Sequence, residues 1–462
     1  MLEKSSAGSG SRRPTALGRR RTKTKMRLSA LVVLTTAAVL VTTVLPLTLP
    51  GVAAATRSVA GQLTRPASDG ARGRQSRGAN AQSPPLAPLP ADNEASAFAF
   101  DPRRPNVVYV ASPDARGGVY VFKTTDNGRH WGLTGARGIG WRSDILSLTA
   151  DPLHSGTLYA GTDTAVYKTV NGGRSWKASK QGLFPRRHKF CWSTGSGRQC
   201  WNYFPYYGTP GKTNWNRNNG WVLDIAVEPT HRNVVYSATD GVRKSTDGGR
   251  TWIRVFKPRR WKWSMVTRIA IAPTKPESIY AIAHRSGTGA TAIYKSTDAG
   301  RTWQMTGGAH SSLPPSCCGD SSDALAADPR NPQTLYAAIG NTVLATTDGG
   351  ASWQPKANGL PAGDITSLAV DPRRSGTVYA SAVVNLNKVK PENVAGGIYK
   401  TTNGGRTWSE VVSGIGVGKI AVDPARPSTI YATGWASWDK THPDKMRLLR
   451  STDGGRTWAI SP

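Results

Sequence analysis

The sequence contains few residues of the types that bind metals or nucleotides in recognisable motifs. Four cysteines and seven histidines are scattered through 462 residues. There is no Cys-x-x-Cys pair, no His-Glu-x-x-His motif and no phosphate-binding glycine loop of the Walker type. These absences argue against a zinc-finger array and against the common metal and nucleotide signatures, so we expect neither a metal site nor a cofactor.

Acidic residues are also scarce, because 28 Asp and Glu stand against 60 Lys and Arg and leave a formal net charge of +32. Hydrophobic residues make up 38% of the chain, which excludes a wholly membrane-embedded protein. The chain is rich in turn formers and large aromatics, with 50 Gly, 31 Pro and 16 Trp. This composition favours many short strands and argues against an all-helical bundle.

The first ninety residues predict an export region followed by a linker. Residues 1–27 are strongly basic around a single acid, Glu3, and residues 28–49 carry no charge over a length that a bilayer requires. We expect residues 1–27 to be a cytoplasmic n-region and 28–55 to be a helical signal peptide or an uncleaved signal anchor. Residues 56–90 have almost no large apolar side chains and predict a flexible basic linker. The rest of the chain, 91–462, is then expected outside the cytoplasm, secreted or anchored to the membrane.

One pattern recurs seven times from residue 91 onward. Each copy has an apolar strand ending at Asp-Pro or a similar pair, a strand containing Tyr, a third strand, and a Ser/Thr-x-Asp-x-Gly-x-x-Trp turn before a short fourth strand. Units of four strands and about 53 residues predict an all-β, seven-bladed β-propeller. We expect seven tryptophans to be buried at equivalent positions: Trp131, Trp176, Trp252, Trp303, Trp353, Trp408 and Trp458. Because the first unit begins with its first strand and the last ends with its fourth, we expect packing alone to close the ring.

The seven turns resemble the Asp-box, or BNR, repeat superfamily. Within it, phrases such as LAVDPRRSGTVYASA and IYKTTNGGRTW look most like the blades of family 74 xyloglucanases. Sortilin-type receptor domains, sialidases and photosystem II assembly factors of the Ycf48/HCF136 kind have similar blades. The resemblance implies a carbohydrate-binding or glycoside hydrolase-like protein, inverting if it is an enzyme. The family 74 enzymes place their catalytic acids between two propellers, whereas this chain supplies one, so no catalytic residue is carried over.

The aspartates of the boxes are predicted to be structural. An Asp in a tight turn accepts hydrogen bonds from the amides of its own turn, and Gly supplies the positive φ. Asn171 and Asn403 replace Asp in two copies. A turn tolerates this exchange, whereas general acid chemistry does not.

The lengths of the connections predict which face of the propeller carries the functional site. If the box turns and the Asp-Pro turns share one rim, the remaining connections share the other. All the long connections fall there: 181–220, 257–265, 307–323, 383–397 and 435–446. We call this second face the variable rim, and we expect function to reside in its loops.

Aromatic residues are concentrated in these long connections. Stacked on the C–H faces of sugars, they would form a polysaccharide-binding platform, although they could equally form a small core of their own. The candidates are Trp192, Trp201, Tyr206, Tyr207, Trp215, Trp221 and Trp261. Cys191 and Cys200 are expected to form a local disulfide, whereas Cys317 and Cys318 could form a vicinal disulfide or bridge separately to the first pair.

Several acids lie near the start of the first strand of a unit, where that strand meets the variable rim. They are Asp144, Asp224, Asp323 and Asp364, and Glu94 has a similar position. Two carboxylates about 6.5 to 9.5 Å apart would suit inverting glycoside hydrolysis. The alternative is that they are ordinary solvated or turn acids.

The sequence therefore leaves two functions open. The first is binding or hydrolysis of an extracellular polysaccharide such as xyloglucan or a cell-wall glycan. The second is a non-enzymatic scaffold that binds protein partners outside the membrane. Nucleic acid is not expected as a partner, because the box arginines are spread around a ring and the chain carries an export signal.

Overall fold

The computed structural model describes residues 96–113, 119–134, 138–139, 143–183, 189–194, 197–202, 221–258, 264–285, 291–307, 323–384, 395–436 and 446–460. The expected n-region (1–27), signal helix (28–55) and linker (56–90) lie outside these residues. Within the described part every regular element is a strand, and no helix there is long and apolar enough to cross a membrane.

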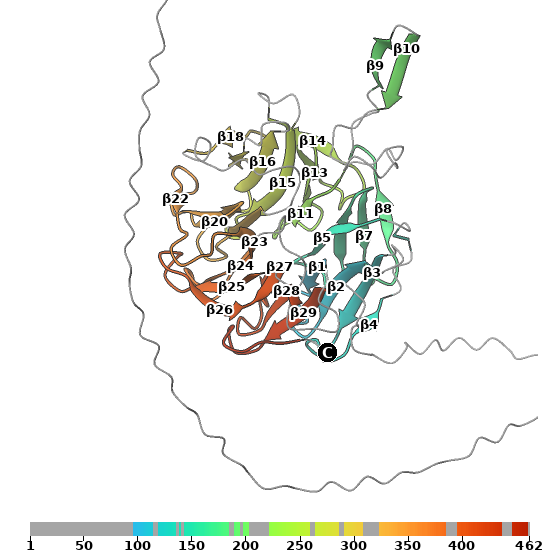
Figure 1. Cartoon of the computed structure of the whole chain (residues 1–462). Helices are drawn as coiled ribbons and strands as arrows, with labels where there is room; N and C mark the ends of the chain where they lie inside the picture. Colours follow the sequence, from blue (N-terminus) through green and yellow to red (C-terminus); the bar gives the residue numbers. More distant parts are fainter. Residues whose placement is uncertain are drawn as a thin grey trace, which may run out of the picture. The chain divides into compact units, whose positions relative to one another are not determined.

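The strands form seven antiparallel sheets of four, which surround a common axis (Figure 1). The first blade consists of β1(Ala97–Phe100), β2(Val108–Pro113), β3(Val119–Thr124) and β4(Gly132–Leu133). The second consists of β5(Ile145–Ala150), β6(Leu158–Thr162), β7(Val166–Thr169) and β8(Lys177–Ser179). The third consists of β11(Asp224–Val227), β12(Val235–Ala238), β13(Val242–Ser245) and β14(Ile253–Phe256). In each blade the strands follow chain order from the axis outward. The seven-bladed prediction is confirmed.

The remaining four blades have the same order. They are β15(Ser264–Ile271), β16(Ile279–Arg285), β17(Thr291–Ser296) and β18(Gln304–Met305); β19(Ala324–Ala327), β20(Leu335–Ile339), β21(Thr342–Thr346) and β22(Gln354–Pro355); β23(Asp364–Val370), β24(Val378–Val384), β25(Ala395–Thr401) and β26(Ser409–Ser413); and β27(Ile415–Val422), β28(Ile430–Ala436), β29(Met446–Ser451) and β30(Ala459–Ile460). A separate two-stranded sheet, β9(Lys189–Thr194) with β10(Gly197–Asn202), belongs to no blade.

Burial within a blade follows the composition of its strands. The second strands, such as β6 and β20, are buried along their whole length, because neighbouring blades cover both of their faces. Their sequences are accordingly continuous apolar runs, LYAGT and LYAAI. The fourth strands, such as β22 and β30, are two residues long and exposed. The core of the ring therefore lies between adjacent blades, among their first three strands.

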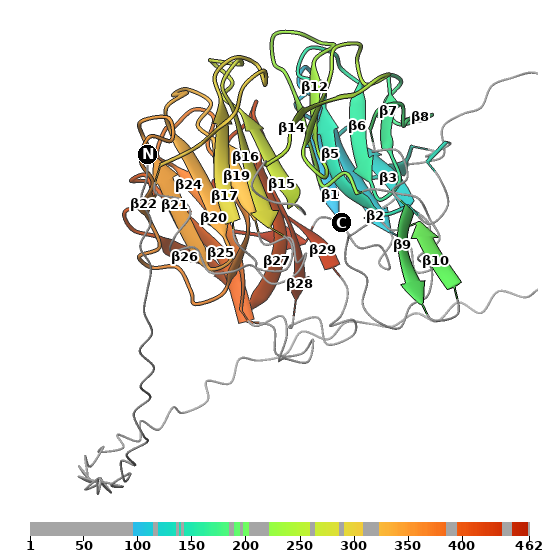
Figure 2. The same cartoon turned by 90° about the horizontal axis from the view of Figure 1, so that it is seen from above.

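The two kinds of turn expected on one rim are hydrogen-bonded to each other in every blade. A backbone N–H in each box turn donates to a carbonyl oxygen in the Asp-Pro turn of the same blade, at 2.8 to 3.1 Å. In the third blade, for example, the Gly248 N–H donates to the Asn233 oxygen at 2.9 Å. Viewed at right angles to Figure 1, the strands run between this box rim and the variable rim (Figure 2).

The box aspartates have the structural role that the sequence predicts. Asp247 Oδ1 accepts hydrogen bonds from the Ser245 hydroxyl at 2.7 Å and the Thr251 N–H at 3.0 Å. Gly249, with φ of 87°, donates its N–H to Ser245 Oγ at 2.7 Å. Asn171 reproduces the arrangement with an amide, accepting from the Ser175 N–H at 3.0 Å. Because the turn has the same geometry in both blades, either Asp or Asn can occupy this position.

Five of the seven box tryptophans are buried, and the expectation for the other two needs correction. Trp252 and Trp353 donate their indole N–H to a hydroxyl on the preceding blade, at Ser179 and Thr306. Trp303 and Trp458 are partly exposed. Their indoles donate instead to carbonyl oxygens of their own turns, at 3.1 and 3.2 Å. These two rings therefore lie nearer the surface.

Hydrogen bonds as well as packing close the ring, which corrects the expectation of packing alone. The Tyr431 hydroxyl, in the seventh blade, donates to the Asn127 carbonyl oxygen of the first box at 2.9 Å. Arg426 donates to the Pro105 carbonyl oxygen and to the Asn127 side chain. The Tyr431 ring also contacts Phe100, with centroids 5.7 Å apart.

Candidate functional site

Much of the predicted aromatic platform lies outside the described residues. Tyr206, Tyr207, Trp215, Trp261, Cys317 and Cys318 are all in that category. Trp192 and Trp201 lie on β9 and β10, where the backbone alone is described. The register of these strands places Cys191 directly opposite Cys200, so the local disulfide stays a prediction with a compatible backbone.

Trp221 is the one platform candidate whose side chain is described, and it is half-buried. The next residue, Val222, is fully buried and donates its N–H to the Thr162 carbonyl oxygen at 2.9 Å. This hydrogen bond brings the end of the long 181–220 connection against the turn between β6 and β7. The Trp221 backbone therefore directly precedes a residue that is bound to the turn containing Asp163.

The four candidate acids lie where the sequence predicts, at the start of innermost strands. Asp224 and Asp364 are the first residues of β11 and β23, and Asp144 and Asp323 directly precede β5 and β19. They do not form one cluster. Asp224 and Asp323 share basic partners near the axis, Asp144 faces a different acid, Asp163, and Asp364 is half-buried apart from both groups.

Asp144 and Asp163 form a carboxylate pair on the variable rim. Asp144 is exposed, whereas Asp163 is partly buried in the turn between β6 and β7. Burial first, and the charge of Asp144 second, raise the pKa of Asp163 to about 6. Nearby polar groups of Ser143, of the Asp144 backbone and of the Asp163 backbone limit that rise. Its Oδ1 is buried and has no hydrogen-bond partner among the described residues.

The same turn in the third blade shows how unusual Asp163 is. There Asp240, which also follows a threonine, is paired with Arg243 at 2.9 Å and Arg254 at 3.3 Å. Asp163 has no such ion pair with any of the cations that the structure describes. The pKa of Asp163 therefore lies nearer to neutral pH than that of an ordinary aspartate, in the direction in which general acids are shifted.

A second group of charges lies among the innermost strands near the axis. Asp224 accepts the Ile269 N–H at 3.0 Å, and the adjacent Arg268 is its largest source of favourable charge. Burial outweighs that charge and raises the pKa of Asp224. Lys419, from β27, faces the same group. Arg268 and burial lower its pKa to about 7, and Asp224 and Asp323 oppose that shift.

Asp323 is held on the other side of this group. Its Oδ2 accepts hydrogen bonds from the Thr267 hydroxyl and the His284 ring, and His284 is held in turn by the Thr291 hydroxyl at 2.8 Å. The charge of His284 lowers the pKa of Asp323 against the effect of burial. Asp224 and Asp323 are thus tied to cations and to neighbouring blades. This arrangement suits a structural ion cluster better than proton transfer to a substrate.

Neither group has the composition of a metal centre. Within the described ranges no three His, Cys, Asp or Glu residues come together as a set of metal ligands. The chemistry that the described part of the variable rim offers is acid–base chemistry of a carboxyl pair.

Comparisons with known proteins agree with this architecture. No protein-family model matches the chain. A xyloglucanase from Paenibacillus sp. is 26% identical over 309 residues, covering 57% of this chain and 29% of the relative. A xyloglucanase from Acetivibrio thermocellus is 25% identical over 280 residues, covering 51% of this chain and 32% of the relative. The chain therefore spans about a third of the length of these curated relatives.

Solved structures show the same fold. The GH74 xyloglucanase from Xanthomonas campestris superposes with a TM-score of 0.54 at 17% identity, over 82% of this chain and 55% of that one. YCF48 from Cyanidioschyzon merolae gives a TM-score of 0.50 at 15% identity, over 79% of this chain and 98% of that one. The chain is an all-β propeller of seven four-stranded blades. It resembles the family 74 xyloglucanases in both sequence and fold.

Asp163 is not among the acids that the sequence predicts. Those acids lie at the start of a first strand, whereas Asp163 lies in the turn between a second and a third strand. The available signal was the Thr-Asp pair directly after the strand LYAG, which lies on the same rim as the long connections.

Proposed function

We propose that this chain is an exported propeller that binds a polysaccharide of the xyloglucan class at its variable rim and hydrolyses it at the Asp144–Asp163 pair. Protonated Asp163 gives its proton to the glycosidic oxygen. Exposed Asp144 acts as the base that activates water. Trp221 offers an aromatic face to a sugar ring beside the pair.

The observation that carries this proposal is the raised pKa of Asp163 next to a second carboxyl on the variable rim. Environments that separate the pKa values of two neighbouring acids are typical of acid–base catalysis. Further support comes from the curated relatives, which are xyloglucanases at 24 to 28% identity. The uncharged segment 28–49 supports export of the propeller, and a polysaccharide of this class is found outside the cell.

The test uses the full chain with xyloglucan oligosaccharides, and it measures binding by calorimetry and released reducing ends by a colorimetric assay. Asp163→Asn should abolish turnover and spare binding, because an amide keeps the shape but cannot transfer the proton. Trp221→Ala should weaken binding by about 1 to 3 kcal/mol and leave the unfolding temperature nearly unchanged.

A matched control is Asp240→Asn, at the same turn position of the third blade, which should keep turnover. Binding without turnover would reduce the proposal to a carbohydrate-binding propeller. The absence of both would favour the alternative, a scaffold for protein partners.

A further inference from the structure

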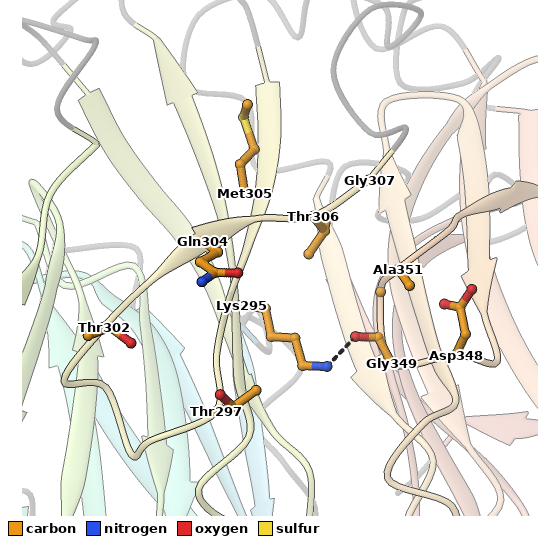
Figure 3. A pocket seen from close by; sticks show the side chains of 11 residues that line it. Lys295, Thr297, Thr302, Gln304, Met305, Thr306, Gly307, Asp348, Gly349 and Ala351 are labelled. Atoms are coloured by element: carbon orange, nitrogen blue, oxygen red, sulfur yellow. Dashed lines mark hydrogen bonds between the residues drawn. The ribbon is translucent and has the colours of Figure 1, made fainter.

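A tyrosine and a lysine join successive blades at the box rim in a repeating contact. The tyrosine lies on the second strand of a blade, and the lysine lies directly opposite it on the third strand. Both reach the box turn of the next blade. In the fourth blade Tyr280 donates to the Gly349 carbonyl oxygen at 3.0 Å. Lys295, directly opposite Tyr280, donates to the same oxygen at 2.6 Å (Figure 3).

The lysine position is the same in five blades. The ammonium groups of Lys123, Lys168, Lys244, Lys295 and Lys400 lie 5.0 to 5.7 Å from the centres of the tyrosine rings opposite them. Lys168, Lys244 and Lys400 also donate to a box carbonyl oxygen at 2.8 to 2.9 Å. The position thus combines a cation–π contact with a hydrogen bond to a backbone oxygen.

The acid that ends the first strand supplies a counter-charge in most of these blades. Asp151 faces Lys168 and Asp371 faces Lys400, and each acid raises the pKa of its lysine against the larger effect of burial. The unit is therefore an ammonium group held by an aromatic ring and a carbonyl oxygen, and a carboxylate attracts it at longer range.

The fifth blade has the tyrosine and the acid of this unit but no lysine opposite the tyrosine. Tyr336 is present, but the residue opposite it in the strand register is Ala345. Asp328 is fully buried; its Oδ1 accepts the Arg330 N–H at 2.8 Å, whereas Oδ2 has no hydrogen-bond partner in the described part of the chain. An unpaired buried carboxylate oxygen is costly to a fold, which points to a missing partner.

A cavity occupies the place of the missing side chain. It measures about 580 Å³ and is lined by Asp328, Tyr336, Ala345 and the box glycine Gly404. The corresponding space in the fourth blade, where Lys295 is present and lines it, measures about 230 Å³. Lys356 and Arg406 also line the larger cavity, but neither forms an ion pair with Asp328 within the residues that the structure describes.

We propose that this cavity binds an alkylammonium group, which takes the place that lysine fills in the other blades. The ligand's ammonium group donates to the Gly404 carbonyl oxygen and lies over the Tyr336 ring, and the Asp328 carboxylate attracts it as the acids of other blades attract their lysines. Ala345 already provides a Cβ atom, so three methylene groups and an ammonium group complete the lysine side chain. The ligand class is a primary alkylammonium ion at least as long as propylammonium, as a free amine or at the end of a lysine side chain.

The test measures binding to the full chain by calorimetry and thermal unfolding, with propylammonium chloride as the probe and potassium chloride at equal ionic strength as the reference. Propylammonium should bind at one site per chain and raise the unfolding temperature by about 2 °C. Equal stabilisation by potassium would overturn the proposal, because the site would then select charge alone.

Two variants locate the site. Ala345→Lys restores the lysine, and Asp328→Asn removes the counter-charge; each should lower the affinity for propylammonium at least tenfold. Unchanged affinity in Asp328→Asn would refute the assignment even if Ala345→Lys failed to fold. The matched control is Lys400→Ala in the sixth blade, which recreates the empty unit beside Asp371 and should add a second site.

Two further probes separate the sources of the ligand. Cadaverine represents free amines, and Nα-acetyl-lysine amide represents the side chain of a protein. Binding of both at the Asp328 site supports an alkylammonium site that accepts either source, and binding of only one assigns the source. Failure of both, together with failure of propylammonium, would overturn the proposal.

Discussion

The Tyr431 hydroxyl donates a hydrogen bond to the Asn127 carbonyl oxygen and joins residues 304 positions apart in the sequence. The contact is the same as the one Tyr236 makes to the Ala299 oxygen at 2.9 Å within the ring. The seventh blade is therefore joined to the first as each interior blade is joined to the next. Closure needs no strand exchanged between the ends of the chain.

This equivalence predicts that loss of the tyrosine hydroxyl lowers the free energy of unfolding equally at the closure and inside the ring. Tyr431→Phe and Tyr236→Phe should each lower the free energy of unfolding by about 1 kcal/mol, because each removes one buried hydrogen bond. Tyr109→Phe is the control, since the Tyr109 hydroxyl has no partner in the described part of the chain, and it should cost less. Chemical denaturation measures all three. A much larger loss in Tyr431→Phe would show that closure is the weak joint of the ring.

The box turns predict a different response to two substitutions of one residue. Asp247→Asn should leave stability nearly unchanged, because Asn171 and Asn403 already make the same contacts. Asp247→Ala should cost about 1 kcal/mol or more, because the Thr251 N–H loses its acceptor. A catalytic role for the box would instead make both variants inactive with little change in stability.

The boxes also predict sensitivity to acid. Hydrogen bonds from Thr251, Ser245 and Arg250 lower the pKa of Asp247 despite its partial burial. The stabilisation by its charge is then present above the ordinary pKa of aspartate and is lost as the pH falls towards the lowered value. Unfolding measured between pH 5 and pH 2 should show a weaker pH dependence in Asp247→Asn than in the wild type.

Lys419 predicts a dependence of the same sign at higher pH. Arg268 and burial lower its pKa to about 7, so between pH 7 and about 10 the unfolded chain binds more protons than the folded one. The free energy of unfolding should therefore rise with pH across that window. Lys419→Met should remove part of the rise and stabilise the protein at pH 7. Lys177→Met, at an exposed lysine, is the control and should leave the rise intact.

The fold was predictable because it depends on local signals that repeat. The seven Asp-box phrases fix the turns, and the apolar runs such as LYAGT fix the buried strands. Repetition also fixes the number of blades. Trp303 and Trp458 could not be separated from the other five, because their exposure depends on the neighbouring blade and not on the box.

The candidate site was less predictable, because its chemistry depends on which acids find a cation. Asp224 and Asp323 look like Asp144 in the sequence, yet Arg268, Lys419 and His284 surround them in the fold. Asp163 and Asp240 occupy equivalent turns of two blades, but Asp240 pairs with Arg243 and Arg254 whereas Asp163 lies near a second acid, Asp144. Such pairings arise between strands and between blades, so a single sequence does not reveal them.

Asp163 also predicts a pH-dependent effect on stability. Its pKa is raised to about 6 from an ordinary value near 3.8, so its ionised form destabilises the fold as the pH rises through this range. Asp163→Asn should therefore be more stable than the wild type above pH 6, by on the order of 1 kcal/mol after allowance for partial exposure to solvent. Below pH 4 the two proteins should have similar stability. A constant difference at all pH values would assign the effect to packing.

The most direct test of the proposed function is the pKa of Asp163, measured by carbon-13 NMR of its carboxyl group with and without a xyloglucan oligosaccharide. The account predicts a value near 6 in the free protein and a clear shift when the oligosaccharide binds, because the glycosidic oxygen replaces water beside the carboxyl group. A pKa near 4 that the oligosaccharide leaves unchanged would contradict it.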